Sequence, residues 1–315
     1  MKKYKIWNTV FIVLVSILML AACGQKGTET ETMADEGVHD VAVTDALGYL
    51  VHVRKPDKTA VLSESLADAW LLAGGELAAT TEDAAGILEE YPETVSLGAL
   101  KSPSVETLIA EEIDLVILSA AISEHVKLRD TLVQAGITAI YFDIEVFADY
   151  EAMMGIFAEI TGHDELYEEN VGRPAEIIAE QIKRADGSQP SVLFLRAYST
   201  GVKAKGSDSM TGQMLRELGC VNIADSDKGL LENLSMEAIL EKDPDYIFVT
   251  TMGSSEQAAL DMVEELLISN PAWQGLKAVQ SGNYYVLPKD LFHNKPNNRW
   301  GESYQILADI LYGEE

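Results

Sequence analysis

The chain contains little cysteine, with Cys23 and Cys220 as the only two in 315 residues. Two cysteines in a chain of this length exclude a small domain held together by disulfide bonds. Cys220 follows an apolar stretch and is interpreted as a small buried thiol. Hydrophobic residues make up 47% of the chain, enough for a substantial core. At ~100–200 residues per domain, we expect two lobes or one large α/β unit.

Basic residues are also scarce. The chain has 23 Lys and Arg against 51 Asp and Glu, which gives a formal net charge of −28. Proteins bind nucleic acids largely through clustered Lys and Arg side chains that neutralise phosphates. The charge balance therefore excludes nucleic acid as a partner, and we interpret the excess acid as a source of solubility.

Motifs for catalysis and metal binding are missing. The sequence has no G-x-x-x-x-G-K-[ST], G-x-S-x-G, H-E-x-x-H or C-x-x-C. A zinc or manganese site needs several His and carboxylate ligands close together. No pair of histidines has such spacing, since they stand at His39, His52, His125, His163 and His293. The sequence predicts a binding protein without cofactor or metal site, not an enzyme.

The first 23 residues have the features of a targeting signal. Three lysines in the first five residues precede an apolar run over 10–20, within the ~7–15 residues of a signal peptide core and shorter than the ~20 of a spanning helix. Residues 20–23, Leu-Ala-Ala-Cys, resemble a bacterial lipobox. This resemblance implies a signal peptide over 1–22, lipidation of Cys23, and a flexible lipidated tether over 23–40. We expect an extracytoplasmic protein anchored to the cell membrane.

From residue 41 onward, short β-rich runs alternate with helical stretches, which is typical of parallel sheets with crossover helices. A hairpin is predicted at 41–43 and 50–53, and a loop at 196–200. The other expected strands are 60–62, 95–97, 115–118 and 139–142 in a first lobe, and 192–195, 221–223, 247–250 and 284–287 in a second, before a final helix over 298–312.

No strand is predicted between 143 and 188, where the pattern is helical. A helix of ~20 residues spans ~30 Å and could join two lobes, with Pro174 marking its kink or its first turn. The predicted fold is α/β, with two Rossmann-like lobes that have central parallel sheets and are joined by one long connecting helix. The lobes are placed at 41–162 and 188–315, and the connecting helix at 163–187.

An internal repeat supports two equivalent halves. The segment 104–117 reads SVETLI and then DLVI, and the segment 235–248 reads SMEAIL and then DYIF. In both, Glu follows Ser by two positions and Asp follows Ser by ten. Each copy predicts an N-capping Ser, a Glu in the first helical turn, a short helix and a buried strand.

These features together resemble the solute-binding lipoproteins of ABC importers, of the helical-backbone class that carries ferric siderophores, haem or cobalamin. The segments that carry the resemblance are 43–48 (VTDALG), 104–117, 132–137 (LVQAGI), 235–248, 270–274 (NPAWQ) and 282–287 (GNYYVL). The resemblance implies that Glu106 and Glu237 dock onto a permease dimer, which is served by separate ATPase subunits. Each Glu could equally be a first-turn partner of the helix dipole.

Ligands of open α/β sheets bind beyond the carboxyl ends of the strands. The loops expected there carry several cations in an otherwise acidic chain, which suits an anionic iron chelate or haem propionates. His125 and Lys295 belong to these cations. The predicted ligand-binding residues are Lys101, Arg196, Tyr198, Met252, Phe292, His293 and Arg299.

The cargo within this class stays open. Haem would need an axial ligand, for which His293, Met252 or Tyr198 is chemically suitable, whereas cobalamin would favour aromatic walls such as Phe292 and Tyr198. The leading hypothesis is a monomeric importer protein that binds an iron chelate. A cobalamin-binding importer lipoprotein and a sensory ligand-binding lipoprotein of the same fold are the alternatives.

Overall fold

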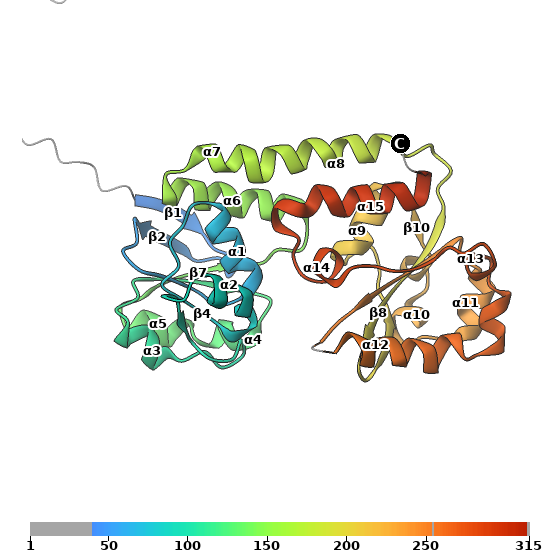
Figure 1. Ribbon diagram of the computed structural model, residues 1–315, viewed down its shortest axis with the longest axis horizontal. Helices are drawn as coiled ribbons and strands as arrows, with labels where there is room; N and C mark the ends of the chain where they lie inside the picture. The colour runs from blue at the N-terminus through green and yellow to red at the C-terminus, as the bar shows by residue number, and fades with distance from the viewer. Residues whose placement is uncertain (1–39, 254, 314–315) are drawn as a thin grey trace, which may run out of the picture. The chain divides into compact units, whose positions relative to one another are not determined.

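A computed structural model describes residues 40–253 and 255–313 (Figure 1). The predicted signal peptide and Cys23 lie outside the described residues, as does nearly all of the predicted tether. Among the described helices, none combines the length and the apolar character needed to cross a membrane.

The first lobe begins with the predicted hairpin. Strands β1 (Asp40–Thr44) and β2 (Leu50–Arg54) pair antiparallel, with Val41 opposite Val53. Asp45 shapes the turn, because its Oδ1 accepts hydrogen bonds from the backbone N–H groups of Leu47 (3.0 Å) and Tyr49 (2.9 Å). This local side-chain bonding is what favours Asp in turns.

A five-stranded parallel sheet with the order β5-β4-β3-β6-β7 follows. Its strands are β3 (Thr59–Val61), β4 (Ala79–Thr80), β5 (Val95–Ser96), β6 (Leu115–Ser119) and β7 (Thr138–Phe142). The helices between them are α1 (Glu64–Leu72), α2 (Ala85–Glu90), α3 (Val105–Ala110), α4 (Ser123–Lys127) and α5 (Arg129–Gln134). Of these five strands, β4 is the one that the sequence pattern did not predict.

The connection between the lobes is helical, as predicted. Helix α6 (Phe147–Thr161) ends at Gly162, whose φ of +78° is the left-handed conformation common after helices. Helix α7 (Asp164–Tyr167), a π-helical turn (Glu168–Gly172) and α8 (Arg173–Lys183) then run on as one long helix (Figure 1). Pro174 is the second residue of α8, in the first turn, where a missing N–H is tolerated.

The second lobe has a sheet with the order β10-β8-β11-β12, in which all neighbours are parallel, and β9 pairs antiparallel with β8. Its strands are β8 (Ser191–Tyr198), β9 (Gly201–Ala204), β10 (Val221–Asn222), β11 (Tyr246–Thr251) and β12 (Tyr284–Val286). Its helices include α9 (Met210–Glu217), α10 (Lys228–Glu232), α11 (Met236–Lys242), α12 (Glu256–Val263), α13 (Lys277–Gln280), α14 (Lys289–Phe292) and α15 (Trp300–Tyr312). The predicted loop at 196–200 is wrong, because β8 continues to Tyr198 and turns back into β9.

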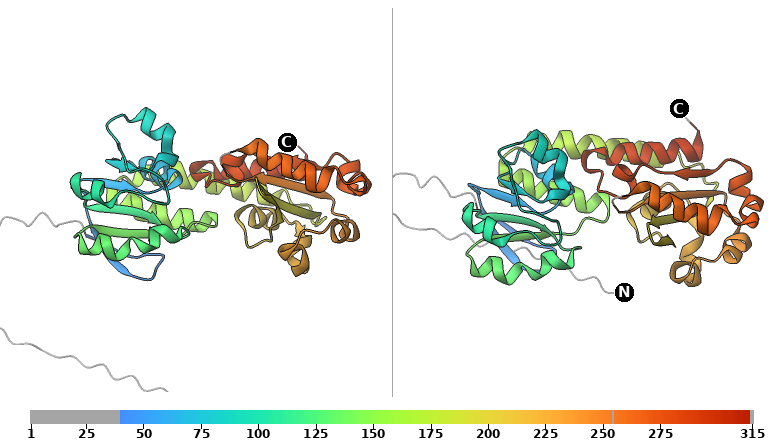
Figure 2. Two further views of the ribbon diagram at one scale, coloured as in Figure 1. Left: turned by 90° about the horizontal axis from the view of Figure 1, so that it is seen from below. Right: turned by 60° about the horizontal axis from the view of Figure 1, so that its bottom comes forward.

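Helix α15 packs along α8 beside the connection (Figures 1 and 2). Gly301 permits this close approach, since a Cβ there would lie 2.9 Å from the Cβ of Ile177. An ion pair between Arg184 and Asp309, with an N–O distance of 2.6 Å, links the same two helices. The predicted long connecting helix is therefore present, and α15 packs alongside its second half.

The two helices of the internal repeat are capped alike. Ser104 Oγ accepts a hydrogen bond from Thr107 N (3.1 Å) at the start of α3, and Ser235 Oγ accepts one from Ala238 N (3.4 Å) at the start of α11. Each bond satisfies a backbone donor that has no partner within the helix. The predicted N-caps are confirmed in both copies.

The aspartates of the repeat have matching roles as well. Asp114 Oδ1 accepts a hydrogen bond from Lys58 N (3.0 Å), just before β3, and Asp245 Oδ2 accepts one from Ser191 N (2.8 Å), the first residue of β8. Strands β6 and β11, which follow these aspartates, pair with β3 and β8. The two lobes are thus built on one repeated unit.

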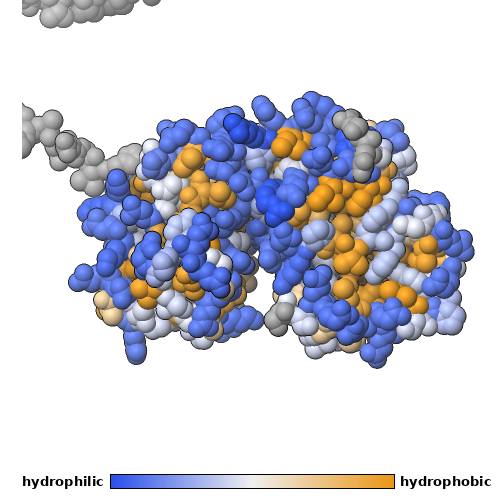
Figure 3. All heavy atoms as spheres, viewed as in Figure 1, coloured by the Kyte–Doolittle hydropathy of each residue, from blue (hydrophilic) through white to orange (hydrophobic). Residues whose placement is uncertain are grey.

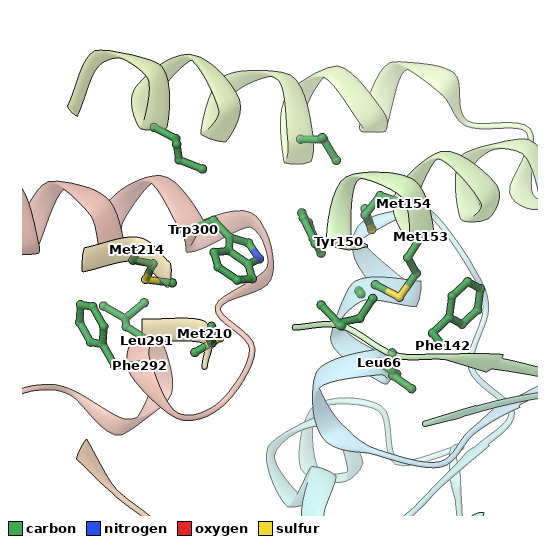
Figure 4. Packing of buried hydrophobic residues seen from close by; sticks show 14 of the residues in the cluster. Leu66, Phe142, Tyr150, Met153, Met154, Met210, Met214, Leu291, Phe292 and Trp300 are labelled. Atoms are coloured by element: carbon green, nitrogen blue, oxygen red, sulfur yellow. The ribbon is translucent and has the colours of Figure 1, made fainter. Parts of the chain in front are cut away.

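Aromatic side chains join the two lobes in a shared core (Figure 4). Trp300 of α15 is 1% exposed, and its ring centroid lies 5.9 Å from that of Phe147 on α6 in an edge-to-face arrangement. In Figure 4, Trp300 points toward Tyr150, which is fully buried. Such aromatic pairs contribute about 1 kcal/mol beyond their buried area, so the lobes are packed together at this point.

Candidate functional site

A cavity of about 230 Å³ lies between the lobes, and the surface is hollowed there (Figure 3). Its first-lobe lining comes from residues 63–66, 83, 119, 121–122 and 142–144 together with Leu100. Most of these residues follow the carboxyl ends of strands, where ligands of α/β sheets bind. The second lobe contributes residues 293–295, which follow α14.

The second-lobe wall of the cavity is basic and partly buried. The Nδ1 atom of His293 is buried and has no hydrogen-bond partner among the described residues. The same is true of Nε of Arg196, a residue of β8 that is near His293 but is not among the residues that line the cavity. Burial, followed by the positive charges of Arg196, Lys289 and Lys295, lowers the pKa of His293 to about 4. Its imidazole is therefore neutral at pH 7, and it shares this wall with cationic side chains.

The pKa of Lys295 is subject to opposing effects. Burial lowers its pKa, while the carboxylates of Asp143 and Glu145 counteract that effect across the cavity, and Arg196 adds to the lowering. Buried polar groups without partners are uncommon and call for an explanation such as a bound ligand. The ammonium group of Lys295 can donate hydrogen bonds from this wall to the oxygen atoms of an anionic ligand.

The first-lobe wall carries the opposite charge. Glu64, Asp83 and Asp143 line it and are exposed to solvent. The backbone N–H of Glu64 donates to Asp83 Oδ2 (2.9 Å). Desolvation raises the pKa of Glu64, and the neighbouring charges of Asp83 and Asp68 raise it further. These acids were not predicted, because only cations were expected to face an anionic ligand, although Glu64 and Asp143 lie in or beside the strand-end loops.

Two predicted residues are not brought to the cavity. Phe292 is 0% exposed within the core, so it is a packing residue, because α14 turns that side chain inward. Arg299 lies on the surface and pairs with Asp290 (2.7 Å) and with Glu302 (2.7 Å). These ion pairs, which occupy its guanidinium, hold it away from the cavity lining.

Three further predicted residues lie elsewhere at the strand ends. Tyr198 lines a separate cavity of about 550 Å³ beside the β8–β9 hairpin. Met252 follows β11 and is 39% exposed, and Lys101 is exposed on the loop before α3. None of the three is among the residues that line the inter-lobe cavity, and neither is Arg196. Of the seven predicted ligand-binding residues, His293 is the one that lines it.

His125 is buried next to a residue that lines the cavity. It is 0% exposed, and its Nε2 lies 2.8 Å from the backbone oxygen of Leu100, which lines the cavity. Burial lowers its pKa, so it is a neutral core histidine. Among the described residues, no group of three or more His, Cys, Asp or Glu side chains could hold a metal ion.

Comparison with known proteins agrees with this architecture. The family model described as periplasmic binding protein matches residues 60–291. The Fe(3+)-citrate-binding protein YfmC of Bacillus subtilis (strain 168) is 23% identical over 293 residues, which cover 89% of this chain and 88% of that protein.

Solved structures show the same fold. The periplasmic catecholate-siderophore binding protein VctP from Vibrio cholerae has a TM-score of 0.70 at 16% identity, covering 86% of this chain and 99% of that one. S. aureus IsdE complexed with heme has a TM-score of 0.67 at 15% identity, covering 81% and 98%. The chain belongs to the periplasmic binding protein family, a family of solute-binding proteins and not of enzymes.

Proposed function

We propose that the chain is the extracytoplasmic solute-binding protein of an ABC importer, that it captures an iron chelate in the inter-lobe cavity, and that ferric citrate is the favoured cargo. The observation that carries the proposal is the basic second-lobe wall, where His293 and Lys295 line the cavity. Among the described residues, Nδ1 of His293 and Nε of the nearby Arg196 are buried and have no hydrogen-bond partner. These atoms suit the carboxylate oxygens of an anionic chelate. The relationship to YfmC, a Fe(3+)-citrate-binding protein, supports the same cargo.

The size of the cavity favours a small chelate over the alternatives. At about 230 Å³, it is smaller than the ~300–1,000 Å³ of pockets that hold drug-sized ligands. Haem and cobalamin are larger than such ligands. Haem remains the second candidate, because the unpartnered nitrogen of the neutral His293 is chemically able to bind iron.

The test is a titration of the purified chain with ferric citrate, a ferric catecholate, a ferric hydroxamate, haem and cobalamin. Intrinsic Trp and Tyr fluorescence reports binding, and absorption spectra report iron ligation. Saturable quenching by ferric citrate at micromolar concentration or below supports the proposal. Binding of haem with a shifted Soret band, lost in His293→Ala, supports the second candidate instead. No binding by any of the five rejects both.

Permease docking through Glu106 and Glu237 is part of the same proposal. Both side chains are exposed in the first turns of α3 and α11, which are equivalent helices of the repeat. Two such acids, one on each lobe, suit a permease dimer with two basic sites and separate ATPase subunits. In cells, Glu106→Arg and Glu237→Arg should abolish uptake of the bound chelate without weakening its binding. Glu241→Arg, an exposed change on α11, is the matched control.

Anchoring through Cys23 and the predicted boundaries of the tether and the lobes remain predictions. If Cys23 is lipidated, Cys23→Ala moves the protein from the membrane fraction to the soluble fraction. Retention of the variant in the membrane fraction would contradict lipid anchoring at this residue. A monomer is expected, which gel filtration with light scattering measures directly.

A further inference from the structure

A short segment of the second lobe, directly after the cavity-lining residues 293–295, is fastened to the first lobe by one asparagine. Asn297 is 3% exposed. Its Nδ2 donates a hydrogen bond to the backbone oxygen of Ser65 (2.8 Å) and another to Asp68 Oδ2 (2.7 Å). Ser65 itself lines the inter-lobe cavity, so the contact lies beside the proposed cargo site.

The backbone at Asn297 is held in an uncommon conformation. Its φ is +49°, in the left-handed region that Asn tolerates better than most residues with a side chain. This turn sets the direction in which the chain leaves the cavity wall and enters α15. Holding such a conformation costs energy, and two partly buried hydrogen bonds to the other lobe are contacts that fix it.

A second asparagine bond reinforces the same contact. Asn298 Nδ2 donates to Asn170 Oδ1 (3.1 Å). Asn170 is 5% exposed in the π-helical turn of the connecting helix, and its own Nδ2 donates to the backbone oxygens of Leu72 and Leu166, both at 3.0 Å. The segment is therefore tied both to α1 and to the connecting helix.

The chemistry at Asn297 requires an amide. Both of its acceptors, a backbone oxygen and a carboxylate oxygen, need an N–H donor, and an amide nitrogen supplies two. An aspartate of the same shape would present two acceptors to two acceptors. Position 297 therefore needs a side chain of the second lobe that donates hydrogen bonds to the first lobe. Packing alone would not need a donor there.

We propose that Asn297 is a positioning residue of the cargo site, which fixes the wall at 293–295 against the wall at 63–66 without touching the cargo itself. The inference rests on the proposed function, in that it takes the inter-lobe cavity as the cargo site. It predicts that cargo affinity depends on a side chain outside the cavity lining. It also predicts that the two walls loosen together when the amide is lost.

The experiment compares the full purified chain with Asn297→Asp, Asn297→Gly and the double variant Asn297→Asp/Asp68→Asn. Glycine keeps the left-handed backbone accessible but removes the amide. The double variant restores a donor and an acceptor between positions 297 and 68. Affinity for ferric citrate and amide hydrogen exchange without ligand are measured at a temperature where the near-ultraviolet circular dichroism of every variant matches the parent.

We expect Asn297→Asp and Asn297→Gly to weaken ferric citrate binding at least tenfold. The double variant should recover part of the loss in Asn297→Asp, because it restores the bond to position 68 but not the bond to the backbone oxygen of Ser65. Hydrogen exchange in Asn297→Asp should rise at least tenfold in segments 293–299 and 63–68, and nowhere else. A merely structural role would raise exchange throughout the lobe or lower the unfolding temperature without changing affinity, and either result overturns the proposal.

The failure of the two proposals can be told apart. If the parent binds ferric citrate and both single variants bind it equally well, the positioning role is wrong and the proposed function stands. If the parent binds none of the chelates, the proposed function is wrong, and the exchange measurement alone decides whether Asn297 holds the two walls together. Unchanged exchange in Asn297→Asp overturns the inference in every case.

Discussion

The first lobe presents Glu64, Asp83 and Asp143 to the inter-lobe cavity as solvent-exposed acids, whereas the second lobe presents His293 and Lys295 as partly buried side chains. Behind these opposite walls, the two lobes repeat the same capped helix and the same aspartate that binds the neighbouring strand. The shared parts are those that folding needs, and the divergent parts lie at strand ends. A duplicated unit can therefore keep its fold while its two ligand-facing edges specialise.

The largest expected effect comes from breaking the difference in charge between the walls. Lys295→Gln should weaken ferric citrate binding roughly a hundredfold, because Lys295 lines the cavity, a hydrogen bond to a charged group is worth ~1.5–3 kcal/mol, and each 1.4 kcal/mol is tenfold. Glu64→Gln on the opposite wall is the matched control and should leave the affinity unchanged or raise it. Calorimetric titration measures both, and equal losses in the two variants would contradict unequal walls.

A smaller effect is expected where the lobes are alike. Asp245→Ala should lower the free energy of unfolding by about 2 kcal/mol, because Asp245 also accepts from the hydroxyl of Ser191 (2.7 Å). Asp114→Ala should cost about 1 kcal/mol, since Asp114 is exposed and its bonds compete with water. Chemical denaturation measures both, with the Asn variants as controls that keep an acceptor. A larger loss at Asp114 would reverse this ranking.

The pH dependence of the unfolding free energy should show the effect of burying His293. The pKa of His293 is about 4 in the folded chain and ordinarily 6.5, so the unfolded chain binds more protons between these values. Stability should therefore fall as pH drops from about 6.5 to 4, by at most ~1.4 kcal/mol per pH unit from this group. The difference between the parent and His293→Gln isolates this contribution, and identical pH profiles would show that the imidazole is not desolvated.

The smallest expected effect concerns the helix caps of the repeat. Ser104→Ala should cost about 1 kcal/mol of unfolding free energy and Ser235→Ala about half as much. Ser104 has the shorter capping bond and also accepts from the hydroxyl of Thr107 at 2.8 Å. Ser102→Ala, in the loop before α3, is the control. Equal losses at the two caps would mean that these differences in geometry carry no energy.

The sequence predicts the lobes and most strands because apolar runs and capping serines are local signals. The cavity wall is harder to predict, because position in a loop does not tell which way a side chain points. His293 and Phe292 are neighbours in the sequence, yet His293 lines the cavity while Phe292 is fully buried in the core. Arg299 is diverted by Asp290, which lies nine residues earlier and contacts it only once α14 and α15 have folded.

The pairing of α8 with α15 has a consequence for the order of synthesis. Helix α8 leaves the ribosome long before residues 300–312. Its face around Ile177 therefore stays uncovered until Gly301 and the rest of α15 have been made. The ion pair of Arg184 with Asp309 likewise joins an early segment to a late one. The first sheet can assemble during translation, but the brace between the lobes closes only after almost all of the described chain has been made.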